Sequence, residues 1–410
     1  MKPISAVILG AGNRGSTYAS YAQEHPDQLQ IIAVADPKPD RRNLLADKLN
    51  ISESNRFASW QELLAHPRMA DCAFVCTLDD DHTQPAIKAM ELGYHLLLEK
   101  PMSNNEEECR AIVEAADKSG CTLAVCHVLR YTPFYMTLKN LIDQGEIGDV
   151  TTINQIENVG YWHQAHSFVR GNWRTVRETS PMILQKSCHD MDIILWLMGK
   201  DCKRVQSFGS LRHFTVENAP EGAPKRCLDG CPHAGSCPYY APALYMDMSR
   251  IGWPVDVITT DLSLEGRRKA LQEGPYGRCV YYCDNDVVDR QVVNLEFDGG
   301  AVATFTMTGL SADFSRQLKI FGTKGQIAAD MGTKEIYLHR FGETKRLIPL
   351  HMDGESSGHG GGDFGIMRDY IRILREGGES RTSAKVSLQS HLICFAAEKS
   401  RIEHVVVELT

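Results

Sequence analysis

The segment QKSCHDMD, residues 185–192, carries side chains that could move a proton. His189 and Asp192 stand three residues apart in it, at the start of an apolar run that ends in glycine. Ser187 and Asp190 have the spacing of a capping box, so we expect a helix with His189 in its first turn. A neutral imidazole there could remove a hydroxyl proton as a general base. A histidine near a helix start is also often purely structural.

Two lysines could assist such a base. Lys100 follows the apolar run HLLLE and precedes a proline. It would lie at the carboxyl end of a parallel strand, where open α/β sheets bind ligands. An ammonium group there could hydrogen-bond a nicotinamide ribose and polarise a substrate hydroxyl. Lys186 stands beside the histidine, and both ammonium groups together with the helix N-terminus would hold His189 neutral.

A glycine-rich motif near the N-terminus predicts a dinucleotide site. The motif GAGNRG follows an apolar run, opens a helical pattern, and consists of Gly10, Gly12, Asn13, Arg14 and Gly15 with one alanine. Asp36 ends the next apolar run, 21 residues after Gly15. In this βαβ unit the glycines admit the pyrophosphate, and Asp36 would bind the adenosine ribose and favour NAD. Arg41 and Arg42 keep the use of NADP open.

The elements that must position these residues change character at about residue 130. Before it, apolar runs such as ISAVILG and DCAFVCT alternate with helical patterns, which indicates a parallel sheet covered on both faces. After it, runs of alternating polarity such as DVTTINQIEN indicate an α+β domain with a largely antiparallel open sheet. We therefore predict a Rossmann domain over residues 1–128 and a substrate and oligomerisation domain over 129–410, with a cysteine-rich insertion at about 212–285.

Five segments give the chain a family resemblance. They are GAGNRG, Asp36, DDDHTQPAIKAMELGYHLLLEKPMS, HVLRYTPFY and KSCHDMD. Their order and spacing resemble the glucose-fructose oxidoreductase, inositol dehydrogenase and MocA family (Gfo/Idh/MocA), with Glu-Lys-Pro at 99–101 as the most specific piece. The resemblance implies an NAD(P)-dependent oxidoreductase that forms a homodimer or homotetramer through its second sheet. The further cofactor-loop residues it implies are Thr77, His82, Glu99 and Lys100.

The segment around His189 departs from the family pattern in part. Family members commonly carry Asp-x-Gly-x-His-x-x-Asp, which His189 and Asp192 match and Gln185 and Ser187 do not. The resemblance implies that His189 is the base and that Asp192 orients its ring or holds a substrate hydroxyl. The departure leaves open whether Lys186 replaces the missing acid.

Two further stretches suggest a sugar pocket. In YWHQAHSFVRGNWR, residues 161–174, aromatic rings stand beside hydrogen-bond donors, and we select Tyr161, Trp173 and Arg174 as substrate ligands. The same rings could instead fill a core beneath a loop. The glycine-rich GHGGGDFG, residues 358–365, would let backbone approach a ligand and adds His359. A similar segment occurs in family members that hydrolyse glycosides.

Cysteines in the insertion predict a metal site. Cys227, Cys231 and Cys237 lie within eleven residues, and Cys279 and Cys283 follow. Three such thiols do not readily pair with one another, whereas a tetrahedral zinc site needs one more ligand, Cys279 or Cys283. We expect structural zinc, with an iron–sulfur cluster or unligated thiols as alternatives. Neither metal would carry the redox step, because hydride chemistry belongs to the nicotinamide.

Composition excludes several other classes of function. The 410 residues include 44 Lys and Arg against 52 Asp and Glu, and this net charge of −8 gives no reason to expect nucleic acid or an anionic membrane as partner. No apolar run reaches the roughly 18 residues of a transmembrane helix. The apolar N-terminal stretch KPISAVILGAG is short and broken by glycines, so we expect the chain to stay in the cytoplasm.

The expected function is therefore hydride transfer between NAD(P) and a carbinol of a sugar, sugar derivative or cyclitol. A glycosidase that oxidises its substrate transiently with bound NAD remains an alternative. A non-catalytic dinucleotide-sensing protein is a third reading, against which the retention of Lys100 and His189 argues.

Overall fold

The N-terminal domain is built on a six-stranded parallel sheet in the order β3-β2-β1-β4-β5-β6. The computed structural model describes residues 2–350 and 358–409. The strands are β1 (Ile4–Leu9), β2 (Leu29–Ala35), β3 (Arg56–Phe57), β4 (Cys72–Val75), β5 (His95–Leu98) and β6 (Leu123–Val125). Strands β1, β4 and β5 are almost wholly buried, as expected for a parallel sheet covered on both faces.

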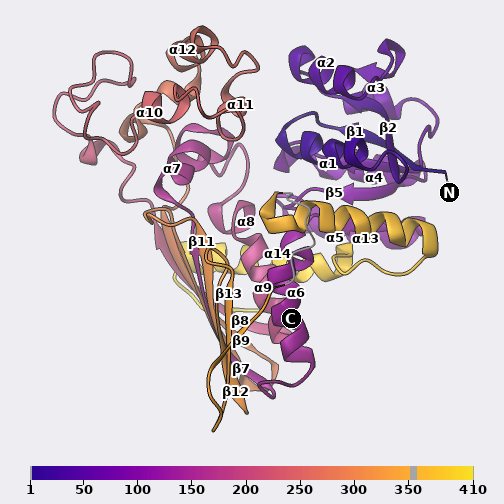
Figure 1. Cartoon of the computed structure of the whole chain (residues 1–410), viewed down its shortest axis with the longest axis vertical. Coiled ribbons are helices and arrows are strands. Elements are labelled where there is room, and N and C mark those ends of the chain that lie inside the picture. The colour runs from indigo at the N-terminus through magenta and orange to yellow at the C-terminus, as the bar shows by residue number, and fades with distance from the viewer. Residues whose placement is uncertain (1, 351–357, 410) are drawn as a thin grey trace.

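Helices cover both faces of this sheet, and one of them comes from the far end of the chain (Figure 1). They are α1 (Asn13–Glu24), α2 (Pro39–Lys48), α3 (Trp60–Leu64), α4 (Thr83–Glu91), α5 (Glu106–Ser119) and α13 (Gly362–Glu376). One core joins α1 and α13 to the sheet, and the other joins α3, α4 and α5 to its opposite face. The last segments of the chain therefore complete the first domain.

The second domain contains a nine-stranded, mostly antiparallel sheet in the order β14-β13-β12-β11-β7-β10-β9-β8-β15. Its strands are β7 (Val150–Asn158), β8 (Cys202–Ser210), β9 (Arg290–Phe297), β10 (Val302–Thr308), β11 (Ser315–Gly322), β12 (Gly325–Asp330), β13 (Glu335–Arg340), β14 (Arg346–Ile348) and β15 (Val407–Glu408). Only β7 and β10 pair in parallel among these strands, with Phe305 opposite Gln155. Both predicted sheet types are confirmed.

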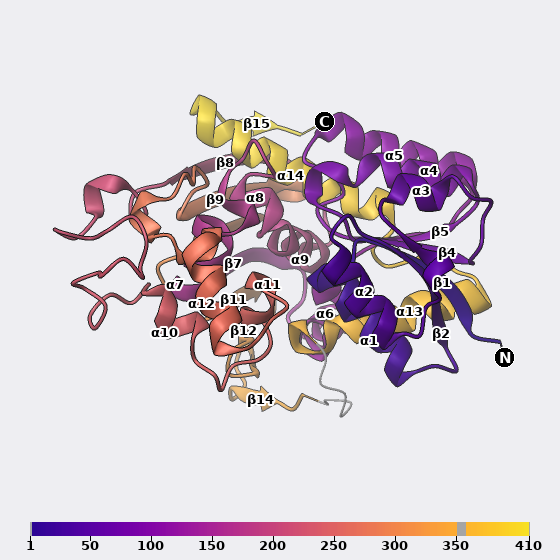
Figure 2. The same cartoon turned by 90° about the horizontal axis from the view of Figure 1, so that it is seen from above.

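Helices pack on one face of this sheet and lead to the domain junction (Figures 1 and 2). They are α6 (Pro133–Asp143), α8 (Met182–Gln185), α9 (Cys188–Met198) and α14 (Ala384–Glu403). Helix α14 runs from the sheet of the second domain to the α5 side of the first, and thereby joins the two domains. In the part of the chain that the structure describes, no helix is both long and apolar enough to cross a membrane.

The chain between β8 and β9, residues 211–289, forms a separate lobe at one end of the second sheet (Figure 1). Its helices are α10 (Ala241–Tyr245), α11 (Val255–Ile258) and α12 (Leu264–Glu273). The lobe contains a small apolar core of its own and shares a second one with Ala165 and Val169. It also reaches the first domain, because Arg41 of α2 donates to the Val257 carbonyl at 3.4 Å.

Candidate active site at the domain junction

The glycine-rich turn between β1 and α1 is shaped by contacts that exclude side chains. A Cβ on Gly10, whose φ is +104°, would lie 2.3 Å from the carbonyl oxygen of Cys76. A Cβ on Gly15 would lie 2.1 Å from the carbonyl oxygen of Gly10. Gly12 has open space around its Cβ position, and exposed Asn13 begins α1. The helix N-terminus is therefore open to an anionic group such as a pyrophosphate.

Asp36 holds this turn to the end of β2. Its carboxylate accepts hydrogen bonds from the backbone N–H of Ala11 and of Lys38, each at 2.8 Å, and the residue is 7% exposed. Each carboxylate oxygen retains capacity for a further donor such as a ribose hydroxyl. Arg42 turns back to the Asp36 carbonyl at 2.6 Å, so its guanidinium is already engaged.

Arg14 is directed into the protein and joins the glycine-rich turn to two other elements. Its Nε donates to Glu99 at 2.6 Å, and its Nη2 forms an ion pair with Asp363 of α13 at 2.7 Å. Burial alone would raise the pKa of Glu99, but Arg14 and Lys100 outweigh it and lower that pKa. Arg14 therefore positions the turn and α13, and its contact with a cofactor stays a prediction.

The loops after β4 and β5 bring Lys100 to the junction. His82 lies between them, with Nδ1 2.7 Å from the Pro101 carbonyl and Nε2 3.2 Å from that of Thr77. It occupies the N-cap position of α4 without a side-chain cap bond. Lys100 reaches from the end of β5 to the second domain, where its Nζ donates to the Gln185 carbonyl at 2.6 Å. His82 thus joins the loops after β4 and β5, and its role at a cofactor stays a prediction.

His189 lies in the first turn of α9, which ends at Gly199 in the left-handed conformation as predicted. The histidine is 4% exposed, and its Nδ1 has no hydrogen-bond partner within the described residues. Burial lowers the pKa of His189 well below the usual 6.5, and Lys100 lowers it further. The ring is therefore neutral at neutral pH and able to accept a proton. The structure places Lys100 and His189 near each other, across the two domains.

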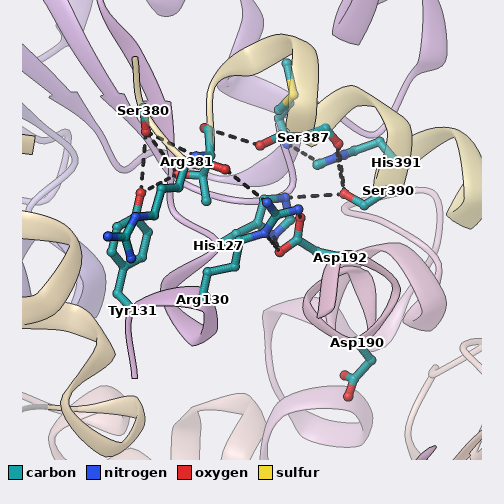
Figure 3. A network of polar contacts seen from close by, with 12 residues as sticks. His127, Arg130, Tyr131, Asp190, Asp192, Ser380, Arg381, Ser387, Ser390 and His391 are labelled. Atoms are coloured by element: carbon teal, nitrogen blue, oxygen red, sulfur yellow. Dashed lines mark hydrogen bonds and ion pairs between the residues drawn. The ribbon is translucent and has the colours of Figure 1, made fainter. Parts of the chain in front are cut away.

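The carboxylate of Asp192 is bound by Arg130 (Figure 3). Arg130 donates to both carboxylate oxygens at 2.7 Å, and Nδ1 of His127 lies 4.0 Å from the same group. Arg130 also donates to the Arg381 carbonyl at 3.0 Å. This geometry gives Asp192 a positioning role, since it fixes α9 against η3 (Val128–Tyr131) and the segment before α14.

Lys186 belongs to a buried charge network at the C-terminal end of α8. Its Nζ lies 3.5 Å from Glu157 on β7. Arg316 of β11 binds the same Glu157 at 2.6 Å and Asp190 at 2.8 Å. Burial raises the pKa of Asp190 to about 7 despite Arg316, and burial also lowers the pKa of Lys186. Arg316 therefore joins Glu157 and Asp190 in one buried network beside Lys186.

The predicted capping box at the start of α9 is wrong. Ser187 holds the N-cap position without a side-chain cap bond, and its hydroxyl donates to Glu157 at 3.1 Å. Sequence reasoning also missed Glu157 and Arg316 themselves. The available signal was the alternation of β7, in which Gln155 and Glu157 occupy buried positions where apolar residues are expected.

The three substrate candidates from residues 161–174 have different contact partners. The ring of Tyr161 faces Tyr239 of the lobe with centroids 6.0 Å apart. Trp173 donates to buried Asp79 after β4 at 3.4 Å. Arg174 pairs with Asp284 at 3.0 Å near the surface. Trp173 is thus hydrogen-bonded to the loop that follows β4.

His359 meets His189 at the junction. The two ring centroids are 5.8 Å apart, and Nδ1 of His359 lies 3.1 Å from the Asp363 carboxylate. Burial would raise the pKa of Asp363, but Arg14 and His359 hold it far below its usual value. Asp363 is therefore an ionised group that can orient His359. The His359–Asp363 pair thus lies beside the ring of His189.

The cysteines of the lobe gather around one small cavity. Cys227, Cys231, Cys237 and Cys279 line a space of about 10 Å³, whereas Cys283 directs its thiol to the Cys279 carbonyl at 3.3 Å. All 13 cysteines are free thiols. Within residues 2–350 and 358–409, no group of three or more His, Cys, Asp or Glu side chains is arranged to hold a metal ion. Zinc at this place remains a prediction.

Comparison with known proteins gives matches over both domains. A model described as an oxidoreductase family with an NAD-binding Rossmann fold matches residues 4–127, and the model of its C-terminal alpha/beta domain matches residues 139–409. The putative oxidoreductase YteT of Bacillus subtilis is 25% identical over 73% of this chain and 72% of its own length. The 2,7-anhydro-N-acetylneuraminate hydratase of Escherichia coli is 26% identical, but only over 49% of this chain and 51% of its own.

A solved structure shows the same fold over the whole chain. Levoglucosan dehydrogenase in complex with NADH and L-sorbose superposes with a TM-score of 0.75 at 18% identity, over 100% of both chains. At this identity the likeness concerns the architecture, which is that of a nucleotide-binding domain followed by an open-sheet domain.

Proposed function

The chain belongs to the Gfo/Idh/MocA family of NAD-binding oxidoreductases, and we propose that it transfers a hydride between NAD and a carbinol carbon of a sugar, sugar derivative or cyclitol. The observation that carries this proposal is that Lys100 reaches across the domain junction to the Gln185 carbonyl and lies close enough to His189 to lower its pKa. The histidine is buried, neutral and unpaired at Nδ1, and the lysine adds a positive charge beside it.

The residues around the glycine-rich turn fit NAD. The free space at Gly12 and the N-terminus of α1 would accept the pyrophosphate, and Asp36 would accept hydrogen bonds from the adenosine ribose. NAD would supply the hydride acceptor. The carboxylate of Asp36 would repel a 2′-phosphate at the ribose, and Arg42 donates to the Asp36 carbonyl through one of its N–H groups. We therefore propose that NADH binds more tightly than NADPH.

The side chains at the junction account for the proton in this reaction. Oxidation of a carbinol breaks the C–H bond, whose electron pair leaves with the hydride, and breaks the O–H bond, whose proton needs an acceptor. Neutral His189 accepts that proton, and the ammonium group of Lys100 stabilises the developing alkoxide. Lys186 offers a donor to a neighbouring hydroxyl in place of the acid that this segment lacks.

A specific observation supports a second function, redox-neutral cleavage or hydration of a glycoside. In that course the oxidised carbon acidifies the adjacent C–H, a second base removes its proton, the bond to the leaving oxygen breaks, water adds and the hydride returns. The pair of His359 and Asp363 is oriented for such a base and lies 5.8 Å from His189, measured between ring centroids. The hydratase relative in Escherichia coli is consistent with this course.

One experiment separates these two functions. The purified protein is incubated with NAD and a panel of sugars, cyclitols and glycosides, while the absorbance of reduced nicotinamide and the release of product are followed together. Net dehydrogenation gives NADH in proportion to product, whereas the redox-neutral course gives product without NADH. A His359→Gln variant should lose the second activity and largely retain the first.

We also propose structural zinc bound by Cys227, Cys231, Cys237 and Cys279. Four thiols that line one cavity can supply the tetrahedral ligand set, after a small movement of their side chains. The surroundings of Arg170 support a zinc site. Arg170 is 2% exposed and donates to the Arg278 and Tyr239 carbonyls and to Cys227 Sγ. Within the described residues no carboxylate lies within ion-pair distance of its guanidinium. A buried guanidinium is costly unless it has an anionic neighbour, and zinc bound by four thiolates would be such an anion.

A second copy of the chain is the partner we propose for the open face of the large sheet. Four strands expose apolar side chains there, namely Ile156, Phe208, Val292 and Val302. A sheet face with such side chains is unusual for a monomer. Light scattering should find a dimer or tetramer, and a charged substitution at Val292 should dissociate it. A monomer at micromolar concentration would contradict this assembly.

A further inference from the structure

Four aromatic side chains from three segments gather beside the charge network. Trp162 and His163 come from α7 (Tyr161–His163), Trp253 from the lobe, and Phe314 from the turn before β11. The ring centroid of Trp253 lies 5.2 Å from that of Trp162 and 4.9 Å from that of His163. Phe314 lies 5.3 Å from His163. Trp253 is 39% and Phe314 51% exposed, so large ring surfaces remain uncovered.

This aromatic cluster is connected to the proposed reaction centre through Lys186. The Lys186 Nζ lies 5.5 Å from the Phe314 ring centroid. The residue before it, Gln185, accepts the hydrogen bond of Lys100 at 2.6 Å. Lys186 also lowers the pKa of His163, after the larger effect of burial, which shows that the two side chains are close. The cluster therefore borders the same site as Lys100.

Buried polar atoms without partners lie at the base of the cluster. Nδ1 of His163 and both amide atoms of Gln164 have no hydrogen-bond partner among the residues that the structure describes. His163 is 8% and Gln164 0% exposed. Leaving such groups unsatisfied costs roughly 1–3 kcal/mol each, which indicates that a ligand or water completes them. The side chain of Gln164 packs directly against Gly309, because a Cβ on Gly309 would lie 2.6 Å from the side-chain amide carbon of Gln164.

We propose that Trp253, Phe314 and Trp162 form a stacking platform for the ring of a cyclic polyol, with the ammonium group of Lys186 beside Phe314 as a donor to its hydroxyls. Aromatic surface beside a few convergent polar groups is the composition of a small-ligand site. A pyranose or cyclitol presents an apolar C–H face together with equatorial hydroxyls, whereas an open-chain polyol does not. Since Trp253 belongs to residues 211–289, the lobe takes part in substrate selection. This inference rests on the proposed function.

The test measures binding, so that it does not depend on turnover. Protein saturated with NADH is titrated by calorimetry with myo-inositol, a set of methyl pyranosides and open-chain sorbitol. We expect at least one cyclic probe to bind about tenfold or more tightly than sorbitol. Equal binding of sorbitol, or no binding of any cyclic probe, would overturn the platform. Hydride transfer without this preference would leave the proposed function intact.

Single substitutions in the aromatic cluster test which side chains bind the cyclic probe. Trp253→Ala and Phe314→Ala should each weaken the best cyclic probe about tenfold, while Trp253→Phe retains most of the affinity. Phe341→Ala is the matched control, because Phe341 is 67% exposed and lies in the turn after β13. Unchanged NADH affinity shows that each variant is folded. For the best substrate KM should rise with kcat little changed. Full affinity in Trp253→Ala would refute the assignment.

Discussion

The imidazole rings of His189 and His359 lie 5.8 Å apart but differ in their surroundings. His189 is buried and its Nδ1 is unpaired, whereas Nδ1 of His359 meets the ionised Asp363 at 3.1 Å. The first ring is therefore suited to accept a hydroxyl proton and the second is held in a fixed orientation. This difference underlies the two reaction courses considered for the site.

Replacing His189 by alanine should remove the proton acceptor and leave the cofactor site unchanged. We expect turnover to fall by about 10²–10⁴-fold, the usual contribution of general base catalysis. NADH affinity, measured by fluorescence titration, should stay within about a factor of two to three, because His189 belongs to α9 of the second domain and the glycine-rich turn to the first. A variant with near-normal turnover would show that another group is the base.

The buried histidines should make the protein sensitive to mild acid. Burial lowers the pKa of His127 to about 4 and that of His391 to about 3. The unfolded chain therefore binds more protons below about pH 6.5, so stability is fully present above that pH and is lost as the pH falls. At pH 5 the loss is about 2 kcal/mol for each residue.

Urea unfolding at pH 7 and pH 5 measures this loss. In the folded protein His391 receives the Met102 N–H at Nε2, and its Nδ1 faces the Ser387 carbonyl, so the neutral ring is matched to its partners. His391→Gln should reduce the pH dependence, whereas the exposed control His404→Gln should not. Equal stability at both pH values would contradict the prediction.

Removing Arg14 should destabilise the first domain strongly. Arg14→Ala leaves the carboxylates of Glu99 and Asp363, both largely buried, without their shared partner. Breaking a buried ion pair in this way costs about 3–5 kcal/mol. Arg110→Ala is the control, since Arg110 forms an exposed pair with Glu106 and should cost less than about 0.5 kcal/mol. Similar free energies of unfolding for both variants would contradict the network.

The proposed zinc site has a direct elemental test. Protein purified without added metal should contain about one zinc per chain, as a single four-ligand site requires. Cys227→Ser should lose the metal, while Cys121→Ser, outside the lobe, should keep it. Absence of zinc from the wild-type protein would show that the four thiols are unligated or bind iron instead, and iron analysis of the same sample decides between these two.

Features set by local sequence were predictable, and features set by distant contacts were not. The limits of α9 followed from its apolar pattern and Gly199. The role of Ser187 did not, because Glu157, 30 residues earlier in the chain, competes for its hydroxyl. The ion pair of Arg14 with Asp363, 349 residues away, did not follow from the glycine-rich motif either. The sequence showed only that Trp253 belongs to an insertion. It did not predict that this side chain lies beside Trp162 and His163.

The stoichiometry of NADH against product tests the central claim most directly. With the best cyclic substrate and excess NAD, the rates of NADH formation and of product formation should be equal through many turnovers. Both rates should fall together in His189→Ala. The claim of net hydride transfer would be contradicted if product formed over many turnovers on substoichiometric NAD while no NADH accumulated.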